Sequence, residues 1–362
     1  MQRFLGIEAA GGILLIFMAV IALIWANSPW SNGYYDLWNT EIHIAIGDLV
    51  SLEHHGHPLT LGQFINDVLM VLFFFVVGLE IKRELVTGEL NTKRAAALPA
   101  AAAIGGMIVP ALLYFAFNQS GDATAGWGIP MATDIAFAVG VVSLLGTRVS
   151  TSLKIFLLTL AIVDDIGAIL VIALFYTEKL SVGWLIVAIF VVFATSLLRA
   201  IKIWYMPVYV ILGLVLWYAI FESGVHATIA GVIMGLLAPA RPLLDTDDEV
   251  EILKMQKINE VESQSLRRLA FQIKETVPVT ERLQNLLHPL TGFIILPLFA
   301  LANAGVSLNA ESIGDAFSSG ITQGIAMGLV VGKIVGITVF TLLAVKMGLC
   351  VLPAGTTPRH VV

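Results

Sequence analysis

The sequence predicts an all-α membrane protein, a polytopic bundle of helices, on three observations. Hydrophobic residues make up 58% of the 362 residues and charged residues only 13%, against roughly a quarter charged in a soluble domain. The mean hydropathy is +0.90. The apolar residues also fall into ten runs, most of them close to the length of about 20 residues that a helix needs to cross a bilayer. We therefore expect one membrane domain over residues 1–362, surrounded by lipid.

The ten predicted spans are separated by charged or turn-forming connections. The first begins ten residues into the chain and has no small-residue cleavage pattern after it, so it is expected to be a retained span rather than a signal peptide. The predicted spans lie near residues 10–27, 64–81, 95–117, 128–146, 153–176, 182–199, 206–221, 224–239, 289–304 and 320–345.

Basic residues in the connections orient these spans, because cytoplasmic loops retain Lys and Arg. With the N-terminus in the cytoplasm, 18 of the 20 basic residues fall on the cytoplasmic side, Lys179 falls outside, and Lys333 lies within the last span. The charged stretch 241–288 then forms a cytoplasmic loop. It is either a solvated connector or a surface helix that lies on the bilayer or against a partner.

Composition excludes several functions. Cys350 is the only cysteine, so no internal disulfide or cysteine-based metal centre can form, and thiol catalysis is not expected. A net charge of −6 disfavours a nucleic-acid partner. Three histidines of the outer loop could hold a metal, but without acidic or cysteine neighbours they are more typical of polar surface: His54, His55 and His57. We expect no cofactor and no enzymatic activity.

Four charged residues are predicted deep in the membrane. The run LTLAIVDDIGAILVIAL places Asp164 and Asp165 side by side, a third carboxylate is Asp134, and Lys333 is the cation. A charge at a helix centre costs about 2.5–3.5 kcal/mol on insertion scales, so such residues are usually functional. Pairing that only holds the bundle together would leave carboxylates unpaired, because three aspartates face one lysine.

Adjacent residues of a helix point about 100° apart. We therefore expect the side chains of Asp164 and Asp165 to have different partners and different roles. One carboxylate can pair with Lys333, and the other can face a water-filled cavity beside Asp134. Burial and like-charge repulsion both favour the protonated form of an acid. A carboxylate that holds either a proton or a small cation can carry the two in opposite directions, because each excludes the other.

A broken helix is predicted in AGWGIPMATDIAFAVG. Gly126, Gly128 and Pro130 propagate a helix poorly, so the span is expected to be interrupted just before Asp134. An unwound segment frees carbonyl oxygens for a cation, and Thr133 adds a hydroxyl. The alternative interpretation is a proline kink without a site.

Three further patterns have a structural interpretation beside a functional one. Glycines recur at every fourth position of the last span, at 320, 324, 328, 332 and 336, and this ridge predicts close helix packing. The cluster GLEIKREL at the end of span 64–81 is typical of a membrane interface. His226, at the start of span 224–239, could titrate near neutral pH or simply be hydrogen-bonded in the packing.

Together these motifs resemble one family. ATDIAFAVG, LAIVDDIGAI, INDVLMVLFFFVVGLEIKREL, GVHATIAGV, LPLFALANAGVSL and VVGKIVGI are similar to the bacterial NhaA sodium/proton antiporters, and the similarity runs through all ten predicted spans. The resemblance implies a multi-pass protein of the bacterial inner membrane with inverted repeats and a possible homodimer. It also implies electrogenic, pH-regulated exchange of Na+ or Li+ for a larger number of protons.

The resemblance further implies residue roles. Asp165 binds sodium and exchanges it for protons, with Asp164 as its neighbour, and Lys333 pairs with an aspartate. Asp134 and Thr133 lie at the unwound segment, and Asp67 lines an outer funnel. The residues implied in pH regulation are Glu80, Lys82, Arg83, Glu84, His226 and His288.

The sequence departs from the family in three places. Gln284 and Asn285 stand where members usually carry a Glu and a His, which bears on the pH at which transport starts. The charged loop from residue 241 is longer than in the best-known members. The sequence ends at LPAGTTPRHVV, where the resemblance implies two further spans, including a second broken helix. Weak or absent exchange is therefore expected of this chain.

Other classes fit fewer of these residues. An intramembrane aspartyl protease normally carries GxGD, whereas these aspartates lie in ATD and VDDIG. A retinal-type photoreceptor would use Lys333 with an aspartate counter-ion, but ten spans and the glycine ridge disfavour a chromophore pocket. A passive cation channel is the main alternative, and it would dissipate a sodium gradient without moving protons.

Overall fold

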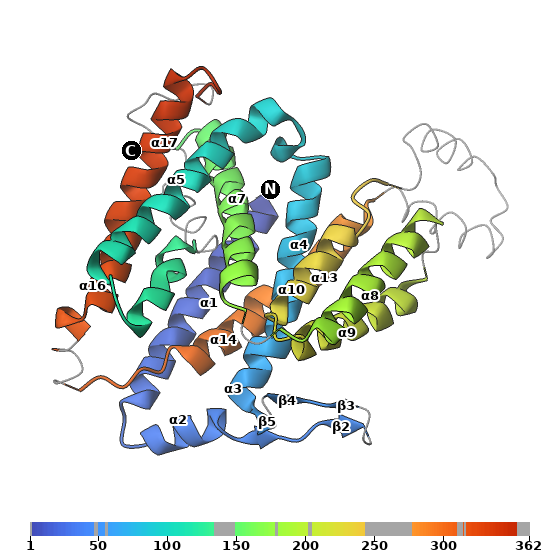
Figure 1. The fold of residues 1–362 in the computed structure, drawn as a ribbon, viewed down its shortest axis with the longest axis vertical. Helices are drawn as coiled ribbons and strands as arrows, with labels where there is room; N and C mark the ends of the chain where they lie inside the picture. The colour runs from blue at the N-terminus through green and yellow to red at the C-terminus, as the bar shows by residue number, and fades with distance from the viewer. Residues whose placement is uncertain are drawn as a thin grey trace.

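The computed structural model is a bundle of long helices (Figure 1). It describes residues 2–46, 50–54, 57–133, 149–177, 180–201, 205–242, 277–309, 314 and 316–352. Within these ranges six helices are long and apolar enough to cross a bilayer: Leu61–Val86, Lys93–Phe117, Ser152–Phe175, Val182–Ala200, Val279–Asn303 and Gly320–Lys346. Helices α1 (Gln2–Ala26) and α2 (Ser31–Trp38) meet at a 117° bend, and the pair would make a seventh span. The predicted class, an all-α polytopic membrane protein, is confirmed.

The other helices also follow the apolar runs. Side-chain caps fix two of their starts, since Thr92 Oγ1 accepts from the amide of Ala95 and Ser150 Oγ from that of Leu153. These elements are α3 (Leu61–Phe64), α4 (Met70–Val86), η2 (Glu89–Asn91), α5 (Lys93–Phe117), η3 (Asp122–Met131), α7 (Thr151–Phe175), α8 (Val182–Ala200), α9 (Met206–Glu222), α10 (Thr228–Leu237), α13 (Val279–Leu290), α14 (Leu296–Asn303), α16 (Gly320–Met327) and α17 (Lys333–Lys346).

Two helices differ in length from the runs that predicted them. The helix predicted to start at 289 begins at Val279, because the polar residues before Pro289 continue the same helix. In the predicted span 224–239 helix α10 has only ten residues: Gly224 turns the chain with a φ of +80°, and Ala238 is extended. Residues 134–148, most of the predicted span 128–146, and residues 243–276 of the charged loop lie outside the described residues.

Three of the long helices contain one turn of π-helix. These turns are η1 (Ile65–Leu69), η5 (Thr291–Ile295) and η6 (Gly328–Gly332). A π turn inside an α-helix is frequent at functional sites, because it re-aims the following side chains. Here η1 contains Asp67, and η6 directly precedes Lys333.

A small sheet that the sequence did not predict lies between α2 and α3. Strands β1 (Glu41–Ile42), β5 (His57–Thr60) and β4 (Glu53–His54) pair antiparallel in that order, and β2 (Ala45–Ile46) pairs with β3 (Val50–Ser51). The strands are too short to give an alternating pattern, but Leu52 and Leu59 are buried. The sheet contains His54 and His57, and the side chains of the three outer-loop histidines are outside the described part, so the structure tests neither the polar-surface interpretation nor metal binding there.

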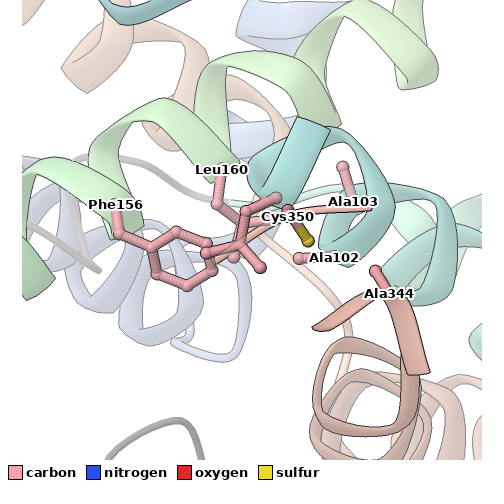
Figure 2. Close-up of a cluster of buried hydrophobic side chains, with 7 residues drawn as sticks. Ala102, Ala103, Phe156, Leu160, Ala344 and Cys350 are labelled. Atoms are coloured by element: carbon pink, nitrogen blue, oxygen red, sulfur yellow. The ribbon is translucent and has the colours of Figure 1, made fainter. Parts of the chain in front are cut away.

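Helices α5 and α17 approach each other closely. A side chain at Gly336 or Gly105 would collide with the other glycine's carbonyl oxygen, so only glycine allows this approach. The predicted ridge therefore does pack a helix. Figure 2 shows the adjoining core, in which small residues of α5 meet α7, α17 and the chain after it: Leu98, Ala102, Ala103, Phe156, Leu160, Ala344 and Cys350.

Helices α4 and α10 form a second close contact on the other side of the bundle. A Cβ at Gly78 would lie 2.6 Å from the carbonyl oxygen of Val232, and one at Gly235 would lie 2.6 Å from that of Phe75. Helices α8 and α9 pack against α10 through Ala188, Leu216 and Ala230. The bundle thus has one group of helices around α5 and another around α4, and α7 contacts both.

Candidate ion-binding site

A buried ion pair links α7 to the helix formed by α16, η6 and α17. The Lys333 ammonium lies 2.6 Å from Asp164 Oδ2, and the two side chains are 14% and 4% exposed. The Lys333 ammonium also donates to the carbonyl oxygen of Met131 at 2.6 Å and to Thr133 Oγ1 at 2.5 Å. All three hydrogens of the ammonium thus have an oxygen acceptor, as a buried cation requires.

The two oxygens of Asp164 have different surroundings. Oδ2 accepts from both Lys333 and the Thr133 hydroxyl. Oδ1 is buried, and no donor within the described ranges binds it. Gly106 of α5 lies against this oxygen, since a Cβ there would be 3.9 Å from Oδ1. A buried carboxylate oxygen without a donor is costly, and it can be satisfied by a proton or by a cation.

The broken segment brings Met131 and Thr133 to this pair. Segment η3 is a 3-10 helix that ends at Met131, and Ala132 is extended with a ψ of 147°. The 3-10 segment therefore ends just before Asp134, and the Met131 carbonyl accepts from Lys333. The rest of the span that was predicted to be interrupted lies outside the described residues. Pro130 is fully buried against the ridge, where a Cβ at Gly328 would lie 2.7 Å from its Cβ.

The other predicted ion-site residues are placed as follows. Asp165 is half-buried on α7, next to Asp164, and it has interactions of its own. Asp134 lies outside the described residues, so the structure does not place its carboxylate. Asp67 lies in η1, and its carbonyl oxygen accepts from Trp217 Nε1 at 2.9 Å.

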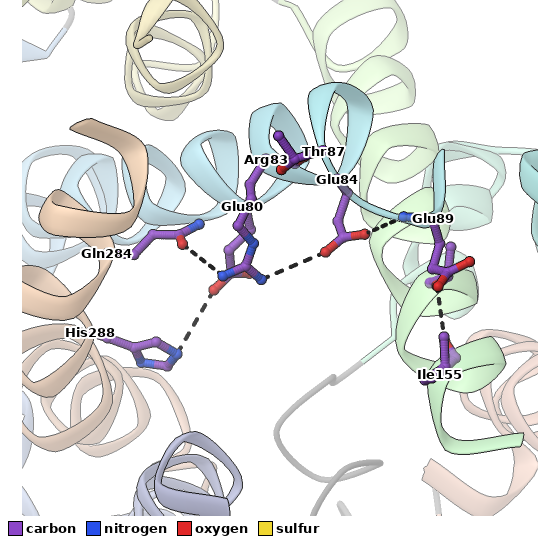
Figure 3. A network of polar contacts seen from close by, with 9 residues as sticks. Glu80, Arg83, Glu84, Thr87, Glu89, Ile155, Gln284 and His288 are labelled. Carbon is purple, nitrogen blue, oxygen red and sulfur yellow. Dashed lines mark hydrogen bonds and ion pairs between the residues drawn. The ribbon is translucent and has the colours of Figure 1, made fainter. Parts of the chain in front are cut away.

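A second group of polar residues joins α4 to α13, and we call it the α4–α13 cluster: Glu80, Arg83, Glu84, Gln284 and His288 (Figure 3). Arg83 Nη1 donates to Gln284 Oε1 at 2.9 Å, and Arg83 Nη2 lies 3.6 Å from Glu84 Oε1. His288 Nε2 lies 3.8 Å from Glu80 Oε1. This contact is an ion pair only when the imidazole is protonated.

Two further residues were predicted for pH regulation. Lys82 lies on α4 between Glu80 and Arg83. His226 is exposed just before α10. It is at the opposite end of α10 from Leu237, whose carbonyl accepts from Arg199 at 3.3 Å.

Several site residues could not be identified from the sequence. Met131 contributes its backbone carbonyl, and a backbone contact of this kind cannot be predicted from the type of residue. Tyr114 and Tyr176 bind η3 through their hydroxyls, yet they look like ordinary aromatic residues of apolar runs. Gln284, noticed only as a departure from a family pattern, is the acceptor for Arg83.

A bundle of apolar spans with a broken segment and a buried carboxylate–ammonium pair has the architecture of a secondary ion transporter. The sequence profile described as Na+/H+ antiporter 1 matches residues 2–362. The chain is 45% identical over 362 residues to Na(+)/H(+) antiporter NhaA 3 of Frankia alni, covering 99% of this chain and 76% of that protein. It is 46% identical over 363 residues to Na(+)/H(+) antiporter NhaA of Rhodopirellula baltica, covering 98% and 80%.

The chain therefore belongs to the Na+/H+ antiporter 1 family, that of the NhaA antiporters. The resemblance predicted from the motifs is confirmed. The comparisons give no support to the passive-channel alternative.

Proposed function

We propose that this chain exchanges Na+, or Li+, for protons across the bacterial inner membrane, with Asp164 and Asp165 as the shared binding site and the N-terminus in the cytoplasm. The observation that carries the proposal is the Asp164 carboxylate. It is buried, one oxygen is held by Lys333 and Thr133, and the other accepts no hydrogen bond from the described residues. Oxygen is the ligand that hard cations prefer.

Competition at the carboxylates couples the two ions. Sodium bound at Asp165 and at Asp164 Oδ1 would weaken the attraction between Asp164 and Lys333, because the cation and the ammonium share one carboxylate. A proton on either acid removes the negative charge that holds sodium. Two acids that each release a proton for one bound sodium ion move net charge, so exchange is electrogenic.

Regulation by pH is proposed to act through the α4–α13 cluster. Protonation of His288 turns its 3.8 Å contact with Glu80 into an ion pair and ties α13 to α4. Loss of that proton at higher pH would release the two helices. Helix α4 also contacts α7, which carries the aspartates, so such a change has a direct packing route to the site.

The test is sodium-dependent proton movement in inverted membrane vesicles that contain the chain. Addition of Na+ or Li+ should alkalinise the vesicle interior, weakly if exchange needs the two further spans that the resemblance implies, and Asp165→Asn should abolish this response. Asp36→Asn, which removes an exposed carboxylate of α2, is the control and should respond like the unaltered chain. Sodium uptake without proton movement would overturn the proposal and indicate a channel.

A further inference from the structure

Two tyrosines hold the 3-10 segment η3 at three successive places. Tyr114 of α5 donates to the carbonyl of Ala123 at 2.6 Å. Tyr176, at the end of α7, donates to the carbonyl of Ala125 at 2.6 Å and accepts from the amide of Gly128 at 2.9 Å. The far end of η3 is held by Lys333 through Met131.

These contacts explain how η3 keeps a form that is weak by itself. Runs of 3-10 helix longer than three or four residues are uncommon, because their hydrogen-bond geometry is poor, and η3 has ten residues. Side chains from α5, α7 and α17 fix its two ends and its middle. The segment is thus stabilised by its neighbours in addition to its own hydrogen bonds.

The glycines of η3 fit the same arrangement. A Cβ at Gly128 would lie 2.7 Å from the Tyr176 hydroxyl, and a Cβ at Gly126 would collide with the Tyr114 hydroxyl. The sequence indicated these glycines as helix breakers, and the structure adds that they admit the tyrosine hydroxyls to the backbone. Trp127 packs on the ring of Tyr176, with the two ring centroids 6.3 Å apart.

We propose that Tyr176 is a positioning residue for ion exchange, which sets where η3 places the Met131 carbonyl and the Thr133 hydroxyl at the ion site. Tyr176 caps the C-terminus of α7, the helix that contains both aspartates, so its hydroxyl fixes the broken segment relative to their carboxylates. This inference rests on the proposed function. Small displacements of ligating or orienting groups have large effects at such sites.

The first experiment measures binding of radioactive sodium to the purified chain, which does not depend on transport. Tyr176→Phe keeps the ring and removes both hydrogen bonds, and the half-saturating sodium concentration should rise about threefold to tenfold. Tyr205→Phe, at a largely exposed tyrosine before α9, is the matched control and should leave it unchanged. Unchanged affinity in Tyr176→Phe, with the same amount of folded protein, would overturn the proposal.

The second experiment measures amide hydrogen exchange over residues 122–133. Tyr176→Phe should accelerate exchange in this segment about tenfold, while Tyr205→Phe should not. Equal exchange rates would overturn the positioning role even if the chain binds sodium. Absence of sodium binding by the unaltered chain would overturn the proposed function instead, and the exchange rates would then still decide whether Tyr176 fixes the segment.

Discussion

The ion site and the α4–α13 cluster use the same kinds of side chains in opposite ways. At the ion site Lys333 contacts three oxygens at 2.5–2.6 Å, and its partner Asp164 is almost fully buried. In the α4–α13 cluster the charged contacts are 3.6 Å and 3.8 Å long, and the side chain of Arg83 is 32% exposed. The first arrangement has short contacts around a nearly fully buried carboxylate, and the second has longer contacts, with Arg83 as its most exposed charged side chain.

This difference has a physical consequence. A tight buried pair is strongly disturbed when one partner is removed or neutralised, because the other charge is left without compensation. In a cluster with longer contacts each charge interacts more weakly with its neighbours, so the change of one charge disturbs the others less. The ion site is therefore suited to an exclusive choice between occupants, and the cluster is suited to a graded response to pH.

The largest effect is expected from Lys333→Ala. It leaves the Asp164 carboxylate buried with the Thr133 hydroxyl as its remaining donor among the described residues, and removal of one partner of a buried pair costs about 3–5 kcal/mol. Thermal unfolding in detergent should show a strong destabilisation that is larger at pH 8 than at pH 5, because protonation of the acid relieves the unpaired charge. Lys346→Ala, at the exposed end of α17, is the control, and equal stability of the two variants would contradict the comparison.

The substitution Gly336→Ala tests the close packing of α5 against α17. The added methyl group would collide with the carbonyl oxygen of Gly105, so the helices must separate, at a cost of roughly 1–3 kcal/mol. Because Lys333 lies on the same helix, its contacts with Met131 and Thr133 should lengthen and sodium binding should weaken. Gly33→Ala, in α2 with open space at its Cβ position, should be neutral. A Gly336→Ala chain with unaltered stability and affinity would show that the close packing does not position the lysine.

A smaller effect is expected from Thr133→Ala. The substitution removes the hydroxyl that donates to Asp164 and accepts from Lys333, a loss of about 1–2 kcal/mol. The sodium concentration that half-saturates exchange should rise about fivefold to thirtyfold in vesicles, while Thr133→Ser should retain most of the affinity. If Ser behaves like Ala, the methyl group rather than the hydroxyl supports the site.

The sequence was sufficient to predict the fold class, because hydropathy and composition dominate membrane insertion. It also predicted that Lys333 pairs with an aspartate, and where helical geometry ends before Asp134. It could not select Asp164 over Asp165 as that partner, because two adjacent residues have the same chemistry and only packing decides which one faces α17. The Met131 carbonyl and the tyrosine hydroxyls were missed for a related reason, since they act through the backbone of η3 rather than through a recognisable motif.

The short strands and the early start of α13 were missed for a different reason. Strands of two residues give no periodicity, and a polar helical turn before an apolar span resembles a loop in hydropathy. The helix from Val279 nevertheless places Gln284 and His288 against α4. Part of the predicted charged loop is thus part of the α4–α13 cluster.

The smallest expected effect concerns Gln284. It tests most directly whether the contacts of the α4–α13 cluster set the pH response. In Gln284→Glu a carboxylate replaces the neutral oxygen that accepts from Arg83 at 2.9 Å, and it adds negative charge near His288. More negative charge favours protonated His288, so a higher pH is needed to remove its proton. The pH at which exchange begins in vesicles should therefore rise. Asn285→Glu places the same charge on the exposed side of α13 and should shift the pH at which exchange begins by a smaller amount. If both variants move the onset equally, the cluster responds only to net surface charge, and its specific contacts with α4 do not set the pH response.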